Sequence, residues 1–134
     1  MEHPAPRVIH VRQGRVEPSG SWLYVWVDVH ASSVEYVGGT GFDPELRAYL
    51  HISSHDHEVG RVRAIVPSAT ERDFDVLAFG LPDAVSRPDA KVALMDRLAG
   101  RSGTADHPRL DDDLVGPIAD AVAVHLRMLD KSDR

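Results

Sequence analysis

Hydrophobic and polar residues alternate most regularly between Trp22 and His30. One side of an extended chain would carry Leu23, Val25, Val27 and Val29, and the other Trp22, Tyr24, Trp26, Asp28 and His30. Period-2 alternation of β-branched and aromatic residues is the signature of a strand. We expect this strand to place its aliphatic side against the core, and its aromatic side at a half-open site or in an aromatic pocket.

A second strand is predicted over residues 34–38, after the small polar stretch 31–33. Two strands this close in sequence form an antiparallel hairpin. The register decides whether Tyr24 and Tyr36 share a face. They do so if the loop has an odd number of residues or a bulge intervenes.

The glycine-rich stretch 38–41 is interpreted as a turn that leads into a helix. Asp43 is a suitable N-cap and Pro44 a suitable first residue, so the helix should run from Pro44 to about Ser53. Its apolar positions are spaced as an inward face and are Leu46, Tyr49 and Leu50. Arg47 and His51 are four residues apart and therefore neighbours on the helix.

The rest of the chain predicts a weak strand over 61–66, a buried strand over 73–80 and two helices. The first helix starts near Ser86 and stops at Gly100, with Val92, Met95 and Ala99 on one apolar line, widened by Ala90, Leu94 and Leu98. The second spans Pro117–Leu129, with Ile118, Val122, Leu126 and Leu129 inward. The acidic run 111–113 lies where negative charge suits a helix N-terminus.

Together these elements predict an α/β (α+β) fold, with a small, mostly antiparallel sheet of three or more strands flanked by helices. We expect one domain over residues 1–134, with a core at about 21–100, a C-terminal helix at about 117–129 and mobile residues 1–7. A chain of 134 residues with 43% hydrophobic and 27% charged residues has the composition of a soluble globular protein.

Composition also limits the kinds of site and partner that the chain can have. The chain has no cysteine, which excludes disulfides and thiolate sites and fits a cytoplasmic protein. It has no run of about 18 apolar residues, so no membrane span is expected. With 15 basic and 21 acidic residues, any contact with DNA or RNA must use a local basic face. Nearly all positive charge is arginine, since Lys91 and Lys131 are the only lysines.

One set of residues points to a family. Tyr36-Val37-Gly38 is followed by Thr40, and Tyr24 lies twelve residues earlier, in Trp22-Leu23-Tyr24. With Arg47 and His51 on the next helix, this pattern resembles the GIY-YIG endonuclease family, although Trp22 replaces the glycine of the first tripeptide. The detailed resemblance covers about residues 22–51, and beyond them only the order of elements is similar.

The resemblance implies hydrolysis of DNA or RNA phosphodiester bonds with Mg²⁺ or Mn²⁺. In such a nuclease the hydroxyl of Tyr24 or Tyr36 would orient or deprotonate the attacking water. Arg47 would hold the scissile phosphate, and His51 would support the tyrosine or the phosphate through hydrogen bonds. Preorganised charge of this kind is often the largest contribution to catalysis.

The family also carries a metal-binding glutamate on the helix after the third strand. Alignment of that helix places Lys91 at this position, and a lysine there would repel a divalent cation. Asp89 is then the candidate metal ligand, with Asp96 as a substitute. The alternative is a catalytically inactive binding or regulatory module of the same fold, with a possible protein partner for targeting. A carboxylate facing the cleft would favour the nuclease, and Lys91 facing it would argue against Mg²⁺ catalysis.

A histidine-rich stretch offers a third hypothesis. His51, His55 and His57, with Asp56 and Glu58, include ligand types suited to Zn²⁺. No thiolate joins them and the predicted loop has no fixed geometry, so we interpret this stretch first as a polar surface loop.

Overall fold

The structure, a computed structural model, describes residues 8, 10–18, 20–100 and 110–132. The N-terminal residues 1–7, expected to be mobile, lie outside the described residues. In chain order the elements are β1 (Val11–Arg12), β2 (Arg15–Val16), β3 (Trp22–Asp28), β4 (Ser33–Thr40), α1 (Pro44–Ser53), α2 (Arg61–Ile65), the 3-10 turn η1 (Ala69–Glu71), β5 (Phe74–Gly80), α3 (Arg87–Leu98), the π-helical turn η2 (Leu110–Val115) and α4 (Gly116–Ser132).

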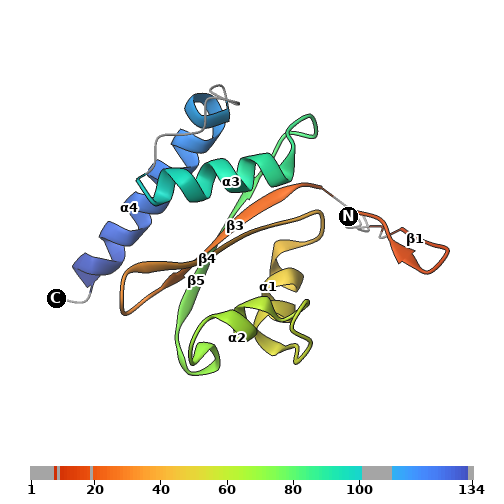
Figure 1. Ribbon diagram of the computed structural model, residues 1–134, viewed down its shortest axis with the longest axis horizontal. Coiled ribbons are helices and arrows are strands. Elements are labelled where there is room, and N and C mark those ends of the chain that lie inside the picture. The colour runs from red at the N-terminus through yellow and green to blue at the C-terminus, as the bar shows by residue number, and fades with distance from the viewer. Residues whose placement is uncertain (1–7, 9, 19, 101–109, 133–134) are drawn as a thin grey trace, which may run out of the picture.

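The main sheet has three antiparallel strands in the order β4-β3-β5, and β1 and β2 form a separate small hairpin. Figure 1 shows α3 and α4 on one face of the main sheet and α1 and α2 on the other. The expected α+β class, with a small antiparallel sheet between helices, is therefore confirmed. Among the described strands of this sheet, β3 is central and β4 and β5 lie at the two edges.

Each face of β3 belongs to a different hydrophobic cluster. The aliphatic face packs against α3, α4 and the turn before α4, through Leu23, Val25, Val27, Ala90, Leu94, Val115, Ile118 and Val122. The aromatic face packs against α2 and η1, where Tyr24 and Trp26 meet Val62, Val66 and Ala69. The prediction that the aliphatic side of this strand faces the core is confirmed. Of the two possibilities for the aromatic side, the structure has a closed aromatic cluster and not a half-open site, because Tyr24 and Trp26 are each only 3% exposed.

A bulge sets the register of the β3–β4 hairpin. Asp28 pairs with Ser33 and Val27 with Val34, but Trp26 pairs with Tyr36, so Glu35 is the extra residue. A four-residue loop alone would place the two tyrosines on opposite faces. The bulge brings Tyr36 to the same face as Tyr24, which was one of the two predicted possibilities.

The predicted strand over 61–66 is wrong, because residues 61–65 form the short helix α2. Val62 and Val66 are both buried, whereas Ile65 is 55% exposed. A spacing of four residues places both valines on one helical face. The helix covers the aromatic face of β3. A helix packed on the sheet thus stands where a further strand was expected.

The inward face of α1 also differs from the prediction. The helix begins and ends as expected, and Asp43 caps it by accepting a hydrogen bond from the Glu45 backbone N–H. However, Leu46 and Tyr49 are 55% and 65% exposed, and the fully buried residue of this helix is His51. The polar His51 takes an interior position because it has a hydrogen-bonding partner there, as described below.

Helices α3 and α4 follow their predicted bounds closely. Ser86 caps α3, and Ala90 and Leu94 are buried as expected. The prediction that Val92 and Met95 belong to the apolar face of this helix is wrong, since these residues are 54% and 47% exposed. Within the described part of the chain, no helix is long and apolar enough to cross a membrane.

The β1–β2 hairpin projects from the side of the molecule (Figure 1). Its turn uses positive φ angles at Gln13 and Gly14, and the Glu17 N–H donates to the His10 carbonyl. The segment after it is held to the turn between β4 and α1, where the Gly20 N–H donates to the Gly41 carbonyl. These contacts fix the base of the hairpin beside the start of α1.

Candidate functional site

The centre of the site is a buried pair formed by Tyr24 of β3 and His51 of α1. Tyr24 Oη and His51 Nε2 lie 2.5 Å apart, and both side chains are almost fully inaccessible. The other imidazole nitrogen, Nδ1, is buried without a hydrogen-bond partner. A hydrogen bond in this low-dielectric position fixes the phenol and the imidazole relative to each other.

Burial holds both groups of this pair in their neutral forms. Burial and the neighbouring Tyr36 raise the pKa of Tyr24 to about 12, although Arg47 and Arg61 act in the opposite direction. Burial, helped by the charges of Arg47, Arg61 and Lys91, lowers the pKa of His51 to about 4. At neutral pH the pair is therefore a neutral hydrogen bond rather than an ion pair.

Tyr36 extends the pair towards the surface. Its ring stacks on that of Tyr24, with centroids 6.4 Å apart, and lies 5.2 Å from the His51 ring. Arg61 Nε donates to Tyr36 Oη over 3.2 Å. Tyr36 is thus a half-buried phenol that connects the buried pair to an exposed guanidinium.

Gly38 makes room for this arrangement. It pairs with Tyr24 across the β3–β4 ladder, and a Cβ added at Gly38 would overlap the phenol ring and hydroxyl of Tyr24. The glycine of the Tyr36-Val37-Gly38 tripeptide therefore has a local steric role, which is to leave the space that Tyr24 fills.

Arg47 lies close to the same cluster. The charge of its guanidinium acts to lower the pKa of Tyr24 and also that of His51. Its Nη1 also donates to the Val59 carbonyl over 2.7 Å, which ties α1 to the loop before α2. The structure therefore gathers the four predicted site residues Tyr24, Tyr36, Arg47 and His51 in one region.

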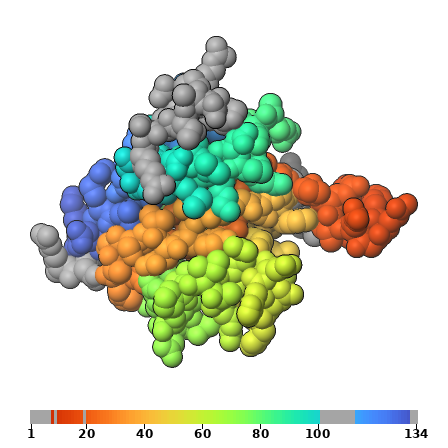
Figure 2. Space-filling view, viewed as in Figure 1, coloured from red at the N-terminus to blue at the C-terminus, as the bar shows by residue number. Residues whose placement is uncertain are grey.

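A cavity of about 440 Å³ opens beside Tyr36 along the free edge of β4. Arg61 of α2 and Lys91 of α3 line it from the two sides of the sheet, and Val34, Glu35, Val37, Met95, Leu98 and Ala99 complete the lining. In Figure 2 the β4 edge is the orange band between teal α3 and yellow-green α2. Two cationic side chains therefore line the same cavity as Tyr36, and Arg61 contacts its hydroxyl.

The carboxylates predicted as metal ligands do not line this cavity. Asp89 lies two residues before Lys91, which is about 200° around the helix axis, so the two residues occupy different faces of α3. Asp96 is likewise absent from the lining residues. The lysine, rather than either aspartate, occupies the cavity.

Glu35, which also lines the cavity, is engaged elsewhere. Its carboxylate accepts hydrogen bonds from Arg72 Nη2 and from Ser33 Oγ. Arg72 also contacts Asp28, which makes Glu35 part of an ionic cluster at the end of the β3–β4 hairpin. Among the described residues, no group of three or more His, Asp or Glu side chains is placed to hold a metal ion. Glu35 is therefore the carboxylate among the residues that line the cavity beside Tyr36, and it is already paired with Arg72.

The histidine-rich stretch lies entirely within the described residues. His51 is buried against Tyr24, whereas His55 and His57 lie on the exposed loop after α1. These side chains do not converge as a metal site. The loop interpretation fits their positions.

Two arginines of this surface were not singled out from the sequence. Arg61 was assigned to a strand, so its place beside Tyr36 could not be foreseen. Arg87, one helical turn before Lys91, lies against Gly39 of β4 and Gly41 just after it. A Cβ added at Gly39 would lie 3.3 Å from Arg87 Cγ, and one at Gly41 would lie 2.6 Å from its Nη1. The i, i+4 spacing of Arg87 and Lys91 was the available signal.

No family model matches this sequence, and no match was found among curated proteins or solved structures.

Proposed function

We propose that this protein is a GIY-YIG-like domain that binds the phosphate backbone of DNA or RNA without a divalent metal ion. The observation that carries the proposal is the placement of Lys91 and Arg61 beside Tyr36 in the cavity at the β4 edge. Metal-binding carboxylates would be needed in this position for Mg²⁺ chemistry. Two cations and a hydroxyl are instead suited to a phosphate anion.

The proposed roles follow from the chemistry of each side chain. Arg61 already donates to Tyr36 Oη through Nε, which leaves its terminal nitrogens for two oxygens of a phosphate. Lys91 supplies a compact charge from the opposite side of the sheet. Arg87 provides a further cation one turn along α3. A backbone that follows the β4 edge would meet these three side chains in succession.

The buried tyrosine–histidine pair then serves as support rather than as a base. Deprotonating Tyr24 is unfavourable, because its pKa is about 12, and His51 has little basicity with a pKa of about 4. Their hydrogen bond instead holds Tyr24 under Tyr36, which fixes the hydroxyl that Arg61 contacts. The neutral, weakly basic pair favours the binding module over the nuclease.

The proposal is tested by fluorescence anisotropy with labelled single-stranded and duplex oligonucleotides in the presence of EDTA. We expect binding in EDTA and weaker binding when Mg²⁺ is added, because the cation competes for phosphate. Lys91→Ala should weaken binding about tenfold, or ~1.4 kcal/mol. Lys131→Ala is the matched control, since Lys131 is the other lysine of the chain and lies exposed on α4.

A second matched pair tests the arginine. Arg61→Ala should weaken binding to a similar degree, whereas Arg63→Ala, two residues along α2, should leave it within about twofold. Absence of binding to every oligonucleotide would refute the proposal. Equal losses in Arg61→Ala and Arg63→Ala would show that general positive charge, and not this cavity, is responsible.

Metal-dependent nucleic-acid hydrolysis remains the second candidate, favoured by the clustering of Tyr24, Tyr36, Arg47 and His51. It is tested by incubating the protein with labelled DNA and RNA with and without Mg²⁺ or Mn²⁺. Cleavage that requires the metal and disappears in Arg47→Ala would establish the nuclease and contradict the metal-free module. We expect no cleavage under these conditions.

A further inference from the structure

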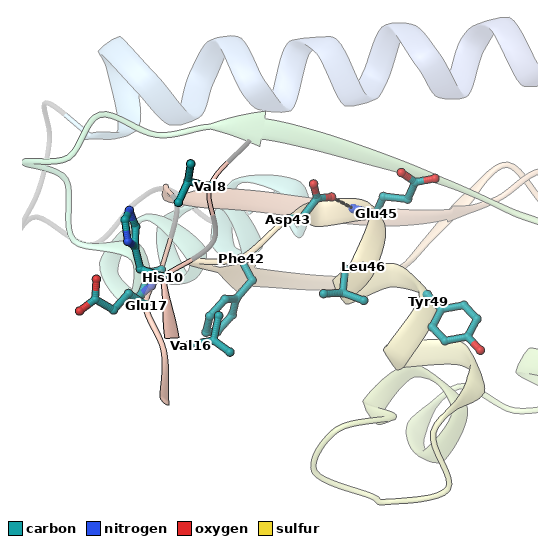
Figure 3. A pocket seen from close by; sticks show the side chains of 10 residues that line it. Val8, His10, Val16, Glu17, Phe42, Asp43, Glu45, Leu46 and Tyr49 are labelled. Carbon is teal, nitrogen blue, oxygen red and sulfur yellow. Dashed lines mark hydrogen bonds between the residues drawn. The ribbon is translucent and has the colours of Figure 1, made fainter. Parts of the chain in front are cut away.

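A second cavity, of about 660 Å³, lies away from the β4 edge, between the β1–β2 hairpin and α1. Figure 3 shows Val16 and Phe42 near its centre, Leu46 and Tyr49 along α1, and Glu17 on the hairpin. We call this surface the hairpin groove. It shares no lining residue with the cavity beside Tyr36.

The hairpin groove collects apolar side chains that neither hydrophobic cluster uses. Phe42 is 38% exposed, Leu46 is 55% exposed and Tyr49 is 65% exposed, although their spacing resembles that of a core-facing helix. Val16 faces them from the hairpin and is 47% exposed. These exposed apolar side chains lie together on the lining of one groove, where they are available for contact with a partner.

The walls of the groove are held in place before any partner binds. The Gly20 N–H donates to the Gly41 carbonyl, so the base of the hairpin is fixed to the start of α1. Pro18 lies so close that a Cβ added at Gly41 would be 2.8 Å from Pro18 Cβ. A preformed groove lowers the entropic cost of binding.

The charge of the groove indicates which kind of partner it can bind. Glu17, Asp43 and Glu45 line it, and none of its described lining residues is a lysine or an arginine. Arg12 lies nearby and contacts His10 Nδ1 at one end of the hairpin. An apolar floor with acidic side chains repels nucleic-acid phosphates and attracts cationic groups. The groove is therefore not an extension of the basic β4 edge.

We propose that the hairpin groove binds a short segment of a partner protein that carries large apolar side chains next to lysine or arginine. The apolar side chains would contact Phe42, Leu46 and Tyr49. The basic side chains would pair with Glu17 and Glu45 at the margin of the same groove. This complementarity sets the partner apart from acidic peptides and from nucleic acids.

The experiment selects a phage library of short random peptides on the full chain and measures enriched peptides by isothermal titration calorimetry. Enriched sequences should combine lysine or arginine with two or more large apolar residues. Leu46→Asp should weaken their binding by about tenfold or more, as expected for a central contact. Val124→Asp is the matched control, because Val124 is 46% exposed on α4.

Charge reversal tests the acidic contribution separately. Glu17→Lys and Glu45→Lys should each weaken the basic peptides, whereas Glu71→Lys, an exposed glutamate outside the groove, should not. Leu46→Asp should still bind oligonucleotides as tightly as the wild type, which separates this proposal from that for the β4 edge. Circular dichroism should show unchanged folding, since all substituted side chains are exposed or partly exposed.

Three results would overturn the proposal. The first is that no peptide is enriched, or that enriched peptides are acidic. The second is that Leu46→Asp and Val124→Asp have equal effects. The third is a concentration-dependent dimer, detected by light scattering, that Leu46→Asp dissociates, because it would assign the groove to a second copy of this chain.

Discussion

Among single residues, Gly38 controls how closely β4 approaches the buried tyrosine. We predict that Gly38→Ala destabilises the protein by about 1–3 kcal/mol, the usual range for overpacking. The added Cβ would overlap the Tyr24 ring, which is confined between β4 and His51. Urea unfolding followed by tryptophan fluorescence measures the change.

Gly80→Ala provides the comparison for this substitution. Gly80 is also a strand glycine, but a Cβ there would lie 3.5 Å from Trp22 Cζ3, an ordinary van der Waals contact. Its stability should stay the same or rise slightly. Equal destabilisation by both alanines would mean that strand flexibility, and not the fit around Tyr24, is responsible.

The buried imidazole makes folding stability depend on pH. The pKa of His51 is about 4 in the folded protein and 6.5 in the reference state, so the unfolded chain binds more protons between these values. Stability is therefore fully present above about pH 6.5 and falls as pH drops towards 4, by an amount on the order of 3 kcal/mol.

Urea unfolding at a series of pH values measures this dependence, and an NMR titration of the His51 imidazole measures its pKa directly. His51→Gln should remove the slope between pH 6.5 and 4. His125→Gln should keep it, although His125 also contacts a carboxylate, that of Asp75. A wild-type His51 that titrates near 6.5 would contradict the assignment of a buried, neutral imidazole.

The sequence could identify the members of the tyrosine–histidine cluster but not their geometry. The spacing of Tyr24, Tyr36 and His51 was visible, and Asp43 and Pro44 correctly located the helix that carries His51. The face of Tyr36 depends on the bulge at Glu35, and no residue type in the hairpin specifies a bulge. The sequence also did not reveal that the Leu46 side chain is exposed, because apolar spacing alone does not say which side of a helix meets the core.

Between elements, the ionic cluster of Arg72, Asp28 and Glu35 joins the segment before β5 to the β3–β4 hairpin. Asp28 is 5% exposed and contacts Arg72 Nε over 2.8 Å. The contacts with Ala31 and Arg72 lower the pKa of the Asp28 carboxyl, which keeps it ionised. Arg72→Met would leave this buried carboxylate without its cation.

We therefore predict that Arg72→Met lowers the melting temperature by several degrees in differential scanning calorimetry. Asp73→Ala removes the neighbouring pair between Asp73 and His30, whose side chains are 74% and 67% exposed. Exposed pairs contribute little, so this control should change the melting temperature much less. Similar shifts in the two variants would show that burial of Asp28 does not strengthen the cluster.

Helix α2 shows why short elements are hard to assign from sequence. Over residues 61–66, Val62, Ala64 and Val66 fit a strand of period two, but Val62 and Val66 alone also fit one helical face. The two patterns coincide over so short a segment. Packing decides between them, because the aromatic face of β3 is covered by α1 and α2, and β3 already has two strand neighbours.

At the scale of the whole molecule, charge is divided between separate surfaces. The chain carries a net charge of −6, yet Arg61 and Lys91 face one cavity and Glu17, Asp43 and Glu45 line another. An acidic protein can therefore present a local basic edge. A chain with more acidic than basic residues needs such an edge if it is to contact nucleic acid. Sequence alone could state this requirement but could not locate the edge, because its cations come from α2 and α3, on opposite faces of the sheet.

The salt dependence of oligonucleotide binding tests this division. For single-stranded nucleic acid, the slope of log K against log salt is about −0.7 for each phosphate neutralised. If Arg61, Lys91 and Arg87 each contact a phosphate, anisotropy titrations over a range of salt concentrations should give a slope of about −2. Lys91→Ala should reduce its magnitude by about 0.7, and Lys131→Ala should leave it unchanged. A slope that Lys91→Ala does not alter would mean that the phosphates lie elsewhere on the molecule, because removing a contacted cation must reduce the number of counterions released.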